Sequence, residues 1–385
     1  MNKTSGIVVC CVATLLALGA VMVYSVISGK ASALDVGTWY LMKHLLWVTT
    51  GIVAMLVVSR IDYHRYERWL WPMAIVAGVF LVLVLVPGIG TFKNGARRWI
   101  RFGPMGFQPS EVAKIALIVV VAAMCARRGE KMREYASMGI CMTVVLATSA
   151  LIVLEPDFGT AALIGGIGTL MVLTAGAPLL PVALVGAAAT VGAATLIWHS
   201  PARADRVLAF LNPWTHDGRA AYQVQHSLIA LGSGGLFGRG LGGSQQKLYY
   251  LPEPDTDFIF AIVGEELGLI GTLLVLVAFV VLIRQGMKIS GRARDPFGAL
   301  LAFGVTVMIA IQALMHVAVV TASMPTKGIA LPFVSSGGSS IVISLIGVGI
   351  LLSVAAQGRE SDAPAPVPQK TPAPADAQPA GATGG

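Results

Sequence analysis

Long apolar stretches separated by shorter polar segments run through most of this 385-residue chain. A helix needs about 17 to 25 predominantly apolar residues to cross a lipid bilayer. Ten stretches reach that length, so the pattern predicts an all-α polytopic membrane protein with about ten transmembrane helices. The predicted spans are residues 6–28, 39–59, 70–87, 110–126, 138–154, 158–176, 179–198, 257–284, 297–321 and 334–356.

The composition agrees with this pattern and limits the domain organisation. The chain is 56% hydrophobic and 12% charged, which is too apolar for an ordinary soluble domain. Residues 1–357 are predicted to form one transmembrane domain, so any catalytic site must lie among its helices and loops. Residues 358–385 are rich in proline and alanine and lack apolar periodicity, which predicts a disordered tail.

The first apolar stretch has two interpretations. Lys3 precedes it and Ala31-Ser32-Ala33 follows it, an arrangement found in cleavable signal peptides. However, the stretch 6–28 is longer than the apolar core of about 7 to 15 residues that is typical of a signal peptide. We favour an uncleaved first transmembrane helix.

Lysine and arginine in the loops predict the orientation of the spans. Short loops on the cytoplasmic side of membrane proteins carry an excess of these residues. Loops 60–69, 127–137 and 285–296 are short and basic, and with ten spans they share one side with both termini. That side is predicted to be the cytoplasm, and the long loop 199–256 before the eighth helix is predicted to be extracytoplasmic.

The loop 199–256 is too long for a simple connection. It contains many apolar and aromatic residues, and short amphipathic or re-entrant helices are predicted near 222–231. The glycine-rich run 232–243 would let the backbone bend closely around another group. We therefore expect this loop to be folded.

The formal net charge of +8 has two explanations, which are compatible. One is the cytoplasmic excess of basic residues, and the other is an anionic ligand. The long extracytoplasmic loops also carry basic residues, which works against the topology rule and favours the ligand. No basic tract has interleaved aromatic residues, so nucleic acid is not expected as a partner. The four cysteines lie in or beside apolar runs and are interpreted as packing residues.

The stretch 245–271 concentrates the candidate chemistry. Glu253, Asp255 and Asp257 lie where a polar loop turns into an apolar helix, and Glu265 and Glu266 follow within that helix. Carboxylates in a bilayer helix are costly and mark function unless they are paired. Asp257 is predicted in the first turn of the helix, where the helix dipole favours an anion, so a structural role competes with a catalytic one.

Several cations and serines are candidates for binding an anionic substrate. Arginine suits bidentate phosphate contacts, and a lysine beside a Gly/Ser-rich helix start can hold an anion. Glu111 and Lys114 are three residues apart and form either an internal ion pair or part of a polar cavity. The candidates are Arg97, Arg98, Lys327, Ser335, Ser339, Glu111 and Lys114.

Asp255-Thr256-Asp257 has the D-x-D spacing that some nucleotide-sugar transferases use to hold a metal. A divalent cation, Mg²⁺ or Mn²⁺, bridging Asp255, Asp257 and a phosphate is a hypothesis at this stage. The spacing is a weak signal, because any acidic loop can produce it.

Several motifs together resemble the SEDS family of peptidoglycan glycosyltransferases. The resemblance covers nearly all of residues 6–356, and the segment Pro325-Thr-Lys-Gly328 is similar to the FtsW/SpoVE branch rather than the RodA branch. The matching segments are Asn94-Gly-Ala-Arg-Arg-Trp-Ile100, Gln108-Pro-Ser-Glu111, Glu155-Pro-Asp-Phe-Gly-Thr160, Asn212-Pro-Trp214, Gly238 to Gly268, and Pro325 to Ser340.

The resemblance implies a SEDS fold and an enzyme that polymerises lipid II at the outer face of the cytoplasmic membrane, for septal synthesis in cell division. It implies that Asp257 is catalytic, as the general base for the acceptor hydroxyl. The lipid pyrophosphate leaving group needs cations, and Arg97, Arg98, Lys247 and Lys327 are the candidates. It also implies a partnership with a class B penicillin-binding protein transpeptidase and with division or elongation proteins.

Two other functions remain open at this stage. A lipid II flippase would explain the intramembrane carboxylates, although transporters place their sites near the bilayer midplane on broken helices and often contain inverted repeats. A scaffold that recruits a transpeptidase is the third hypothesis. The position of the carboxylates and cations in extracytoplasmic loops favours the enzyme.

Overall fold

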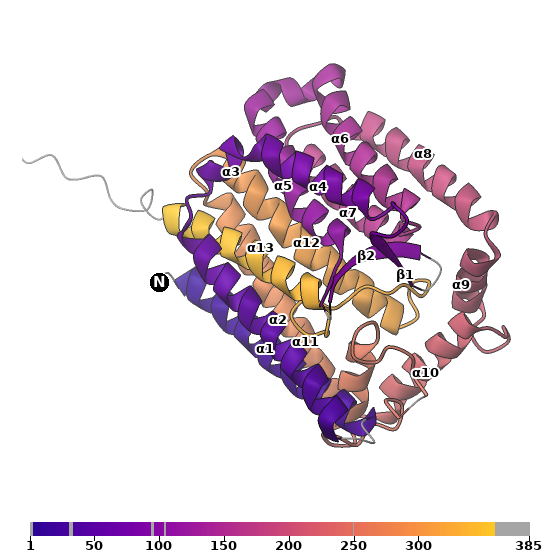
Figure 1. The fold of residues 1–385 in the computed structure, drawn as a ribbon. Coiled ribbons are helices and arrows are strands. Elements are labelled where there is room, and N and C mark those ends of the chain that lie inside the picture. Colours follow the sequence, from indigo (N-terminus) through magenta and orange to yellow (C-terminus); the bar gives the residue numbers. More distant parts are fainter. Residues whose placement is uncertain (1–2, 31–33, 94–95, 104, 249, 359–385) are drawn as a thin grey trace, which may run out of the picture.

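The computed structural model describes residues 3–30, 34–93, 96–103, 105–248 and 250–358. It is a bundle of helices with one small sheet (Figure 1). Among these residues, eight helices are long and apolar enough to cross a membrane, and two shorter apolar helices, α4 and α7, accompany them. Each coincides with a predicted span, so the polytopic helical fold is confirmed. The predicted tail 358–385 lies outside the described residues except for Gly358.

The helices follow one another with short connections. Their bounds are α1 Lys3–Lys30, α2 Leu34–Arg60, α3 His64–Arg68, α4 Leu70–Leu83, α5 Pro109–Arg128, α6 Tyr135–Leu154, α7 Phe158–Thr174, α8 Leu179–Trp198, α9 Pro201–Leu211, α10 Arg219–Ser233, α11 Ile259–Gly291, α12 Pro296–Val320 and α13 Gly338–Gln357. A 3-10 turn, Gly129–Arg133, joins α5 to α6. The helices α9 and α10 lie in the long loop, as predicted for 222–231.

Helix α5 lies at the centre of the bundle. It packs against α4, α6, α7 and α12, and most of its side chains are buried. Helix α2 packs along α13, and α1 packs along α11. By contrast, α8 lies at the edge of the bundle in Figure 1, and most of its residues are exposed. The central helices thus form a packed core that can carry polar groups away from lipid.

The mostly α-helical bundle carries one small sheet that the apolar pattern did not predict. Strands β1 Gly90–Lys93, β2 Ala96–Phe102 and β3 Met105–Phe107 form an antiparallel sheet in the order β1-β2-β3. Lys93 at the end of β1 pairs with Ala96 at the start of β2. Asn94-Gly95 lies outside the described residues, but this dipeptide favours two-residue hairpins and is the signal in the sequence for these strands.

Helix α11 is broken at Gly268, whose φ of +67° is accessible to glycine at little cost. The glycine-rich loop after α10 supplies hydrogen bonds at the break. The N–H groups of Arg239 and Gly240 donate to the carbonyls of Glu265 and Glu266 at 2.9 and 3.0 Å, and Leu269 N–H donates to Gly235 at 2.9 Å. A helix break within a membrane bundle requires such protein partners, because lipid offers none.

Glu265 and Glu266 are fully buried beside this break, and both carboxylates are occupied. Glu265 accepts hydrogen bonds from the Ser244 hydroxyl and from Gln245 N–H. Glu266 pairs with Lys247, whose Nζ lies 2.7 Å from Oε1, and it accepts from the Ser25 hydroxyl on α1. These bonds tie the loop to α1 and α11, so both carboxylates have a structural role here.

We expect Lys247→Met to destabilise the protein, because it leaves Glu266 buried without its cation. Loss of one partner of a buried pair costs about 3–5 kcal/mol. Thermal unfolding in detergent should show a clear fall in Tm. The double variant Lys247→Met/Glu266→Gln should recover part of that loss, since residue 266 then carries no buried charge. A single variant as stable as wild type would contradict this role.

Candidate active site

Asp257 lies in a tight turn that precedes α11. The N–H groups of Thr256 and Asp257 both donate to the carbonyl of Glu253, at 3.3 and 3.0 Å. Glu253 itself has a left-handed backbone, with φ of +49°. Since α11 begins at Ile259, the prediction that Asp257 occupies the first helical turn is wrong.

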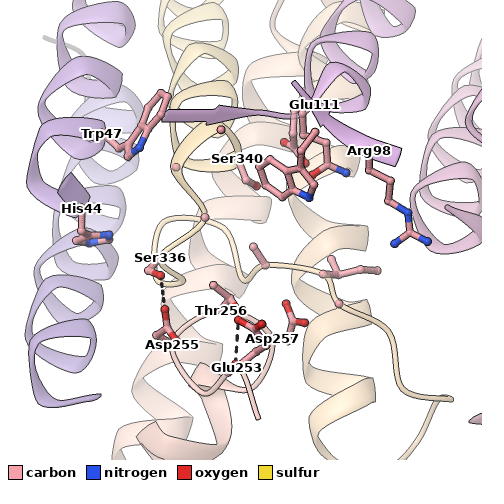
Figure 2. Close-up of a pocket in the computed structure, with 18 of the residues that line it drawn as sticks. His44, Trp47, Arg98, Glu111, Glu253, Asp255, Thr256, Asp257, Ser336 and Ser340 are labelled. Carbon is pink, nitrogen blue, oxygen red and sulfur yellow. Dashed lines mark hydrogen bonds between the residues drawn. The ribbon is translucent and has the colours of Figure 1, made fainter. Parts of the chain in front are cut away.

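The loop before α13 holds this turn in place. The Ser335 hydroxyl donates to the Thr256 carbonyl at 2.6 Å, and the Ser336 hydroxyl donates to Oδ2 of Asp255 at 2.7 Å. Ser336 N–H also donates to the Asp255 carbonyl at 2.9 Å. Figure 2 shows Asp255 and Ser336 facing each other, with Asp257 on the other side of the turn. The position of Asp257 therefore depends on two loops that are far apart in sequence.

A cavity of about 560 Å³ opens beside the turn, between α2, the sheet, α5 and the start of α13. Figure 2 shows its walls. The polar and aromatic residues that line it include Tyr40, Lys43, His44, Trp47, Arg98, Trp99, Arg101, Gln108, Glu111, Lys114, Asp157, Thr160, Glu253, Asp255, Thr256, Asp257, Gln312, Ser336 and Ser340. The mixed lining suits a ligand that has both sugar and charged groups.

One wall of the cavity carries a charged cluster. Lys327 Nζ lies 2.6 Å from Oδ1 of Asp157, and Arg98 Nε lies 3.9 Å from Oδ2. Arg98 also donates to the backbone carbonyls of Glu155 and Pro156, which fixes its guanidinium. Arg206 on α9 interacts electrostatically with Asp157 and Asp257. Three cations thus lie around Asp157 and Asp257, and arginine and lysine side chains suit a phosphate group.

The two aspartates of this region have opposite pKa shifts. Burial raises the pKa of Asp257 to about 6, and the nearby carboxylates of Glu253 and Asp255 add to the rise. Burial would also raise the pKa of Asp157, but Lys327 and Arg98 outweigh it, and the net shift is downward. Asp257 is therefore suited to accept a proton near neutral pH, while Asp157 stays ionised as a structural anion.

The depth of the cavity holds a buried polar network. Lys114 Nζ lies 2.9 Å from Glu111 Oε2 and donates to Gln312 Oε1 at 2.8 Å. The amide nitrogen of Gln312 then donates to the Ala330 carbonyl at 2.9 Å and to the Ser340 hydroxyl at 3.2 Å. This network connects α5, α12 and α13 beneath the cavity and is positioned to contact a ligand there.

Comparison with known proteins identifies the family. The FtsW/RodA/SpoVE family, described as cell cycle protein, matches residues 6–360. The chain belongs to this family. The resemblance to the SEDS proteins noted from the motifs is thereby confirmed.

Members of the FtsW/RodA/SpoVE family align with almost the whole chain. A probable peptidoglycan glycosyltransferase FtsW from Trichlorobacter lovleyi is 42% identical over 348 residues, which cover 90% of this chain and 91% of the relative. Stage V sporulation protein E from Bacillus subtilis is 38% identical, with 90% and 95% covered. The alignments therefore cover about nine-tenths of this chain and of each relative.

Solved structures of the family share the fold. A chain from a peptidoglycan synthase complex that coordinates polymerization and crosslinking matches with a TM-score of 0.74 and 25% identity, covering 91% of this chain and 97% of that chain. The rod shape determining protein RodA of Thermus thermophilus matches with a TM-score of 0.67 and 26% identity, covering 91% and 95%. The bundle described above is the family fold.

The structure brings together most of the site residues predicted for this family member. Asp255, Asp257, Arg98, Glu111 and Lys114 line the cavity, and Lys327 reaches its wall through Asp157. The remaining candidates are not among the lining residues: Arg97 pairs with Phe92 in the sheet, Lys247 is buried against Glu266, Ser335 holds the turn, and Ser339 is buried in α13. Their substrate contacts stay predictions.

Sequence reasoning missed Asp157, Gln312 and the α2 residues His44 and Trp47 as site residues. Asp157 lies between two predicted spans, where a carboxylate suits a turn and the start of a helix, and no role in the site was predicted for it. Its side chain accepts from Thr160 N–H and so caps α7. His44 and Trp47 lie inside a predicted span, where nothing in the sequence separates cavity-facing from lipid-facing positions.

The fit of the site to a metal ion is limited. Within the described residues, no three His, Cys, Asp or Glu side chains converge as metal ligands. Asp255 already accepts a hydrogen bond from Ser336. Mg²⁺ is often held by only one or two carboxylates together with substrate phosphates, so a site shared by Asp255, Asp257 and a phosphate stays a prediction.

Gly328 provides a test of the position of Asp257. A Cβ atom at Gly328 would lie 2.6 Å from Oδ2 of Asp257 and 3.2 Å from its Cγ. Gly328→Ala should therefore turn the carboxylate away and lower kcat about 10- to 100-fold, with folding intact. Gly186→Ala on α8, where no heavy atom lies within 4 Å, is the matched control. Equal activity of both variants would contradict the placement of Asp257.

Proposed function

We propose that this chain polymerises lipid II into glycan strands at the outer face of the cytoplasmic membrane, with Asp257 as the general base. The chain is a peptidoglycan glycosyltransferase of the FtsW/RodA/SpoVE family, and the naming of its FtsW relatives supports a role in septal synthesis. The observation that carries the proposal is the position of Asp257, a carboxylate with a pKa of about 6 beside a cluster of cations.

The geometry supports a single displacement. The Asp257 carboxylate takes the proton of the acceptor sugar's 4-hydroxyl as that oxygen forms a bond to the anomeric carbon of the donor. The bond from that carbon to the lipid pyrophosphate breaks, and its electron pair leaves with the pyrophosphate. Arg98, Lys327 and Arg206 lie where they can stabilise this developing charge.

A divalent cation belongs to the proposal as an additional ligand of the pyrophosphate. Asp255 and Asp257 are the residues that would hold Mg²⁺ or Mn²⁺, which would supply further neutralisation of the leaving group. Arg98, Lys327 and Arg206 would neutralise part of the pyrophosphate charge without the divalent cation.

We infer the orientation from the loops. The basic loops between α2 and α4, between α5 and α6, and between α11 and α12 lie on the cytoplasmic side, and the turn with Asp257 lies outside. The likeness to a chain of a peptidoglycan synthase complex supports a class B penicillin-binding protein transpeptidase as partner, together with division proteins. In this proposal, crosslinking is performed by that partner.

The broken helix α11 is the one observation that favours the lipid II flippase, since transporters use such breaks. However, Glu265 and Glu266 at the break are occupied by Lys247, Ser25 and Ser244 and do not line the cavity. The flippase is therefore the weaker candidate.

The direct test is polymerisation of lipid II by the purified protein, with its transpeptidase partner and Mg²⁺ or Mn²⁺ present. We expect glycan strands that are visible after denaturing electrophoresis. Transport of a fluorescent lipid II analogue across vesicles without any glycan would instead support the flippase.

The rate of polymerisation should depend on pH through Asp257. Below its pKa of about 6 the carboxyl is protonated and cannot accept the hydroxyl proton. The rate should therefore rise about tenfold per pH unit below that value and level off above it. The measurement is kcat from pH 4.5 to 8, with unfolding followed at each pH. A flat profile between pH 4.5 and 7 would contradict the assignment.

A further inference from the structure

The wall of the cavity opposite the cationic cluster has no role in the mechanism above. It consists of the α2 residues Tyr40, Lys43, His44 and Trp47 and the segment Ser336 to Gly338, where α13 begins. Figure 2 shows His44 and Trp47 on one side and Arg98 on the other, with the turn of Asp255 and Asp257 between them. The cavity therefore has two chemically different sides.

His44 is a buried polar group directed at this cavity. Its side chain extends from α2 and lines the cavity (Figure 2), and the residue is only 5% exposed. Within the described residues, its Nε2 has no hydrogen-bond partner. A buried ring nitrogen without a hydrogen bond destabilises the folded protein, so we expect a polar group of a ligand to be its partner.

Trp47 lies one helical turn from His44 and forms a flat apolar surface. A Cβ atom at Gly338 would lie 2.6 Å from its Nε1, so the indole lies close against the first residue of α13. The first backbone N–H groups of a helix have no partner within the helix and can donate to an oxygen of a ligand. An aromatic face, an imidazole and free N–H donors are suited to a sugar ring, which has apolar faces and polar edges.

The geometry of the reaction indicates which of the two sugars lies on the α2 side. In a single displacement, the attacking oxygen and the leaving group lie on opposite sides of the reacting carbon. The cluster of Arg98, Lys327 and Arg206 defines the leaving-group side, and Asp257 lies between the two walls. Lys43, the cation on the α2 side, already has an interaction partner in the chain. The ring that carries the attacking hydroxyl must then occupy the α2 side.

We propose that His44, Trp47 and the start of α13 form the acceptor subsite, which binds the uncharged N-acetylhexosamine ring with a hydrogen bond to His44 Nε2. This assignment rests on the proposed glycosyltransferase function. His44 and Trp47 position the acceptor, and Asp257 performs the proton transfer.

The test is equilibrium binding to the purified protein without turnover. One probe is a radiolabelled, pyrophosphate-free N-acetylglucosaminyl-N-acetylmuramyl pentapeptide, and the other is undecaprenyl pyrophosphate. His44→Ala should weaken the first probe about three- to tenfold, the loss of one hydrogen bond, and leave the second unchanged. His44→Gln, which keeps a hydrogen-bonding group, should recover most of the affinity. Met42→Ala, at an exposed position on the same helix, is the matched control.

Two results would overturn the subsite: unchanged saccharide affinity in His44→Ala, or an equal loss for both probes in His44→Ala and His44→Gln. Because no turnover is needed, this outcome is independent of the proposed function. If His44→Ala selectively weakens saccharide binding but the wild-type protein forms no glycan, the subsite is supported and the polymerase function is contradicted.

Discussion

Asp257→Asn should fold and insert like wild type yet lose polymerisation by about 100- to 10,000-fold, the usual contribution of a general base. The amide has nearly the same shape as the carboxylate but cannot accept the hydroxyl proton. Since Asp257 lies in a turn held by backbone bonds to Glu253, the side chain is not needed to keep the turn. The measurement is glycan formed from lipid II by the purified complex.

The control for this variant is Asp217→Asn, an exposed carboxylate in the connection between α9 and α10. It removes the same charge from the same side of the bundle and should retain wild-type activity. Thermal unfolding and binding of the transpeptidase should be unchanged in both variants. Normal glycan yield from Asp257→Asn would refute its role as base.

Replacement of Lys327 should have the second largest effect. Its Nζ is 2.6 Å from Asp157, and both side chains are mostly buried. Lys327→Met should lower kcat/KM about 100- to 1,000-fold, because a cation that stabilises the leaving pyrophosphate is lost. It should also destabilise the protein by about 3 kcal/mol, since Asp157 loses its nearest cation and keeps the more distant Arg98 and Arg206. Steady-state kinetics and thermal unfolding measure the two effects.

The double variant Lys327→Met/Asp157→Asn separates these effects. It removes the orphaned charge and should recover stability, whereas the cation is still missing and activity should stay low. Lys288→Met, at an exposed position near the C-terminal end of α11, is the matched control for loss of a lysine. Recovery of activity together with stability would show that Lys327 acts only through folding.

Periodicity was sufficient to predict the helical bundle because bilayer spans require long apolar runs, and each predicted span has its helix. It was insufficient for the sheet, since strands of three to seven residues beside arginines give little periodic signal. Asp257 was found from its sequence context, but its exact place required the bonds to Glu253 and the serines before α13. Pairing such as Lys247 with Glu266 depends on which helices meet, and a single sequence does not contain that information.

The turn of residues 253–257 and the loop with Ser335 and Ser336 behave as one unit, although about 80 positions separate them. This has a consequence for chimeras between family members. A chimera that exchanges the loop before α13 but not the turn before α11 would combine segments from two different proteins. The hydrogen bonds between them would then be mismatched, and Asp257 would lose its alignment. Functional chimeras should therefore be those that transfer both segments from the same parent.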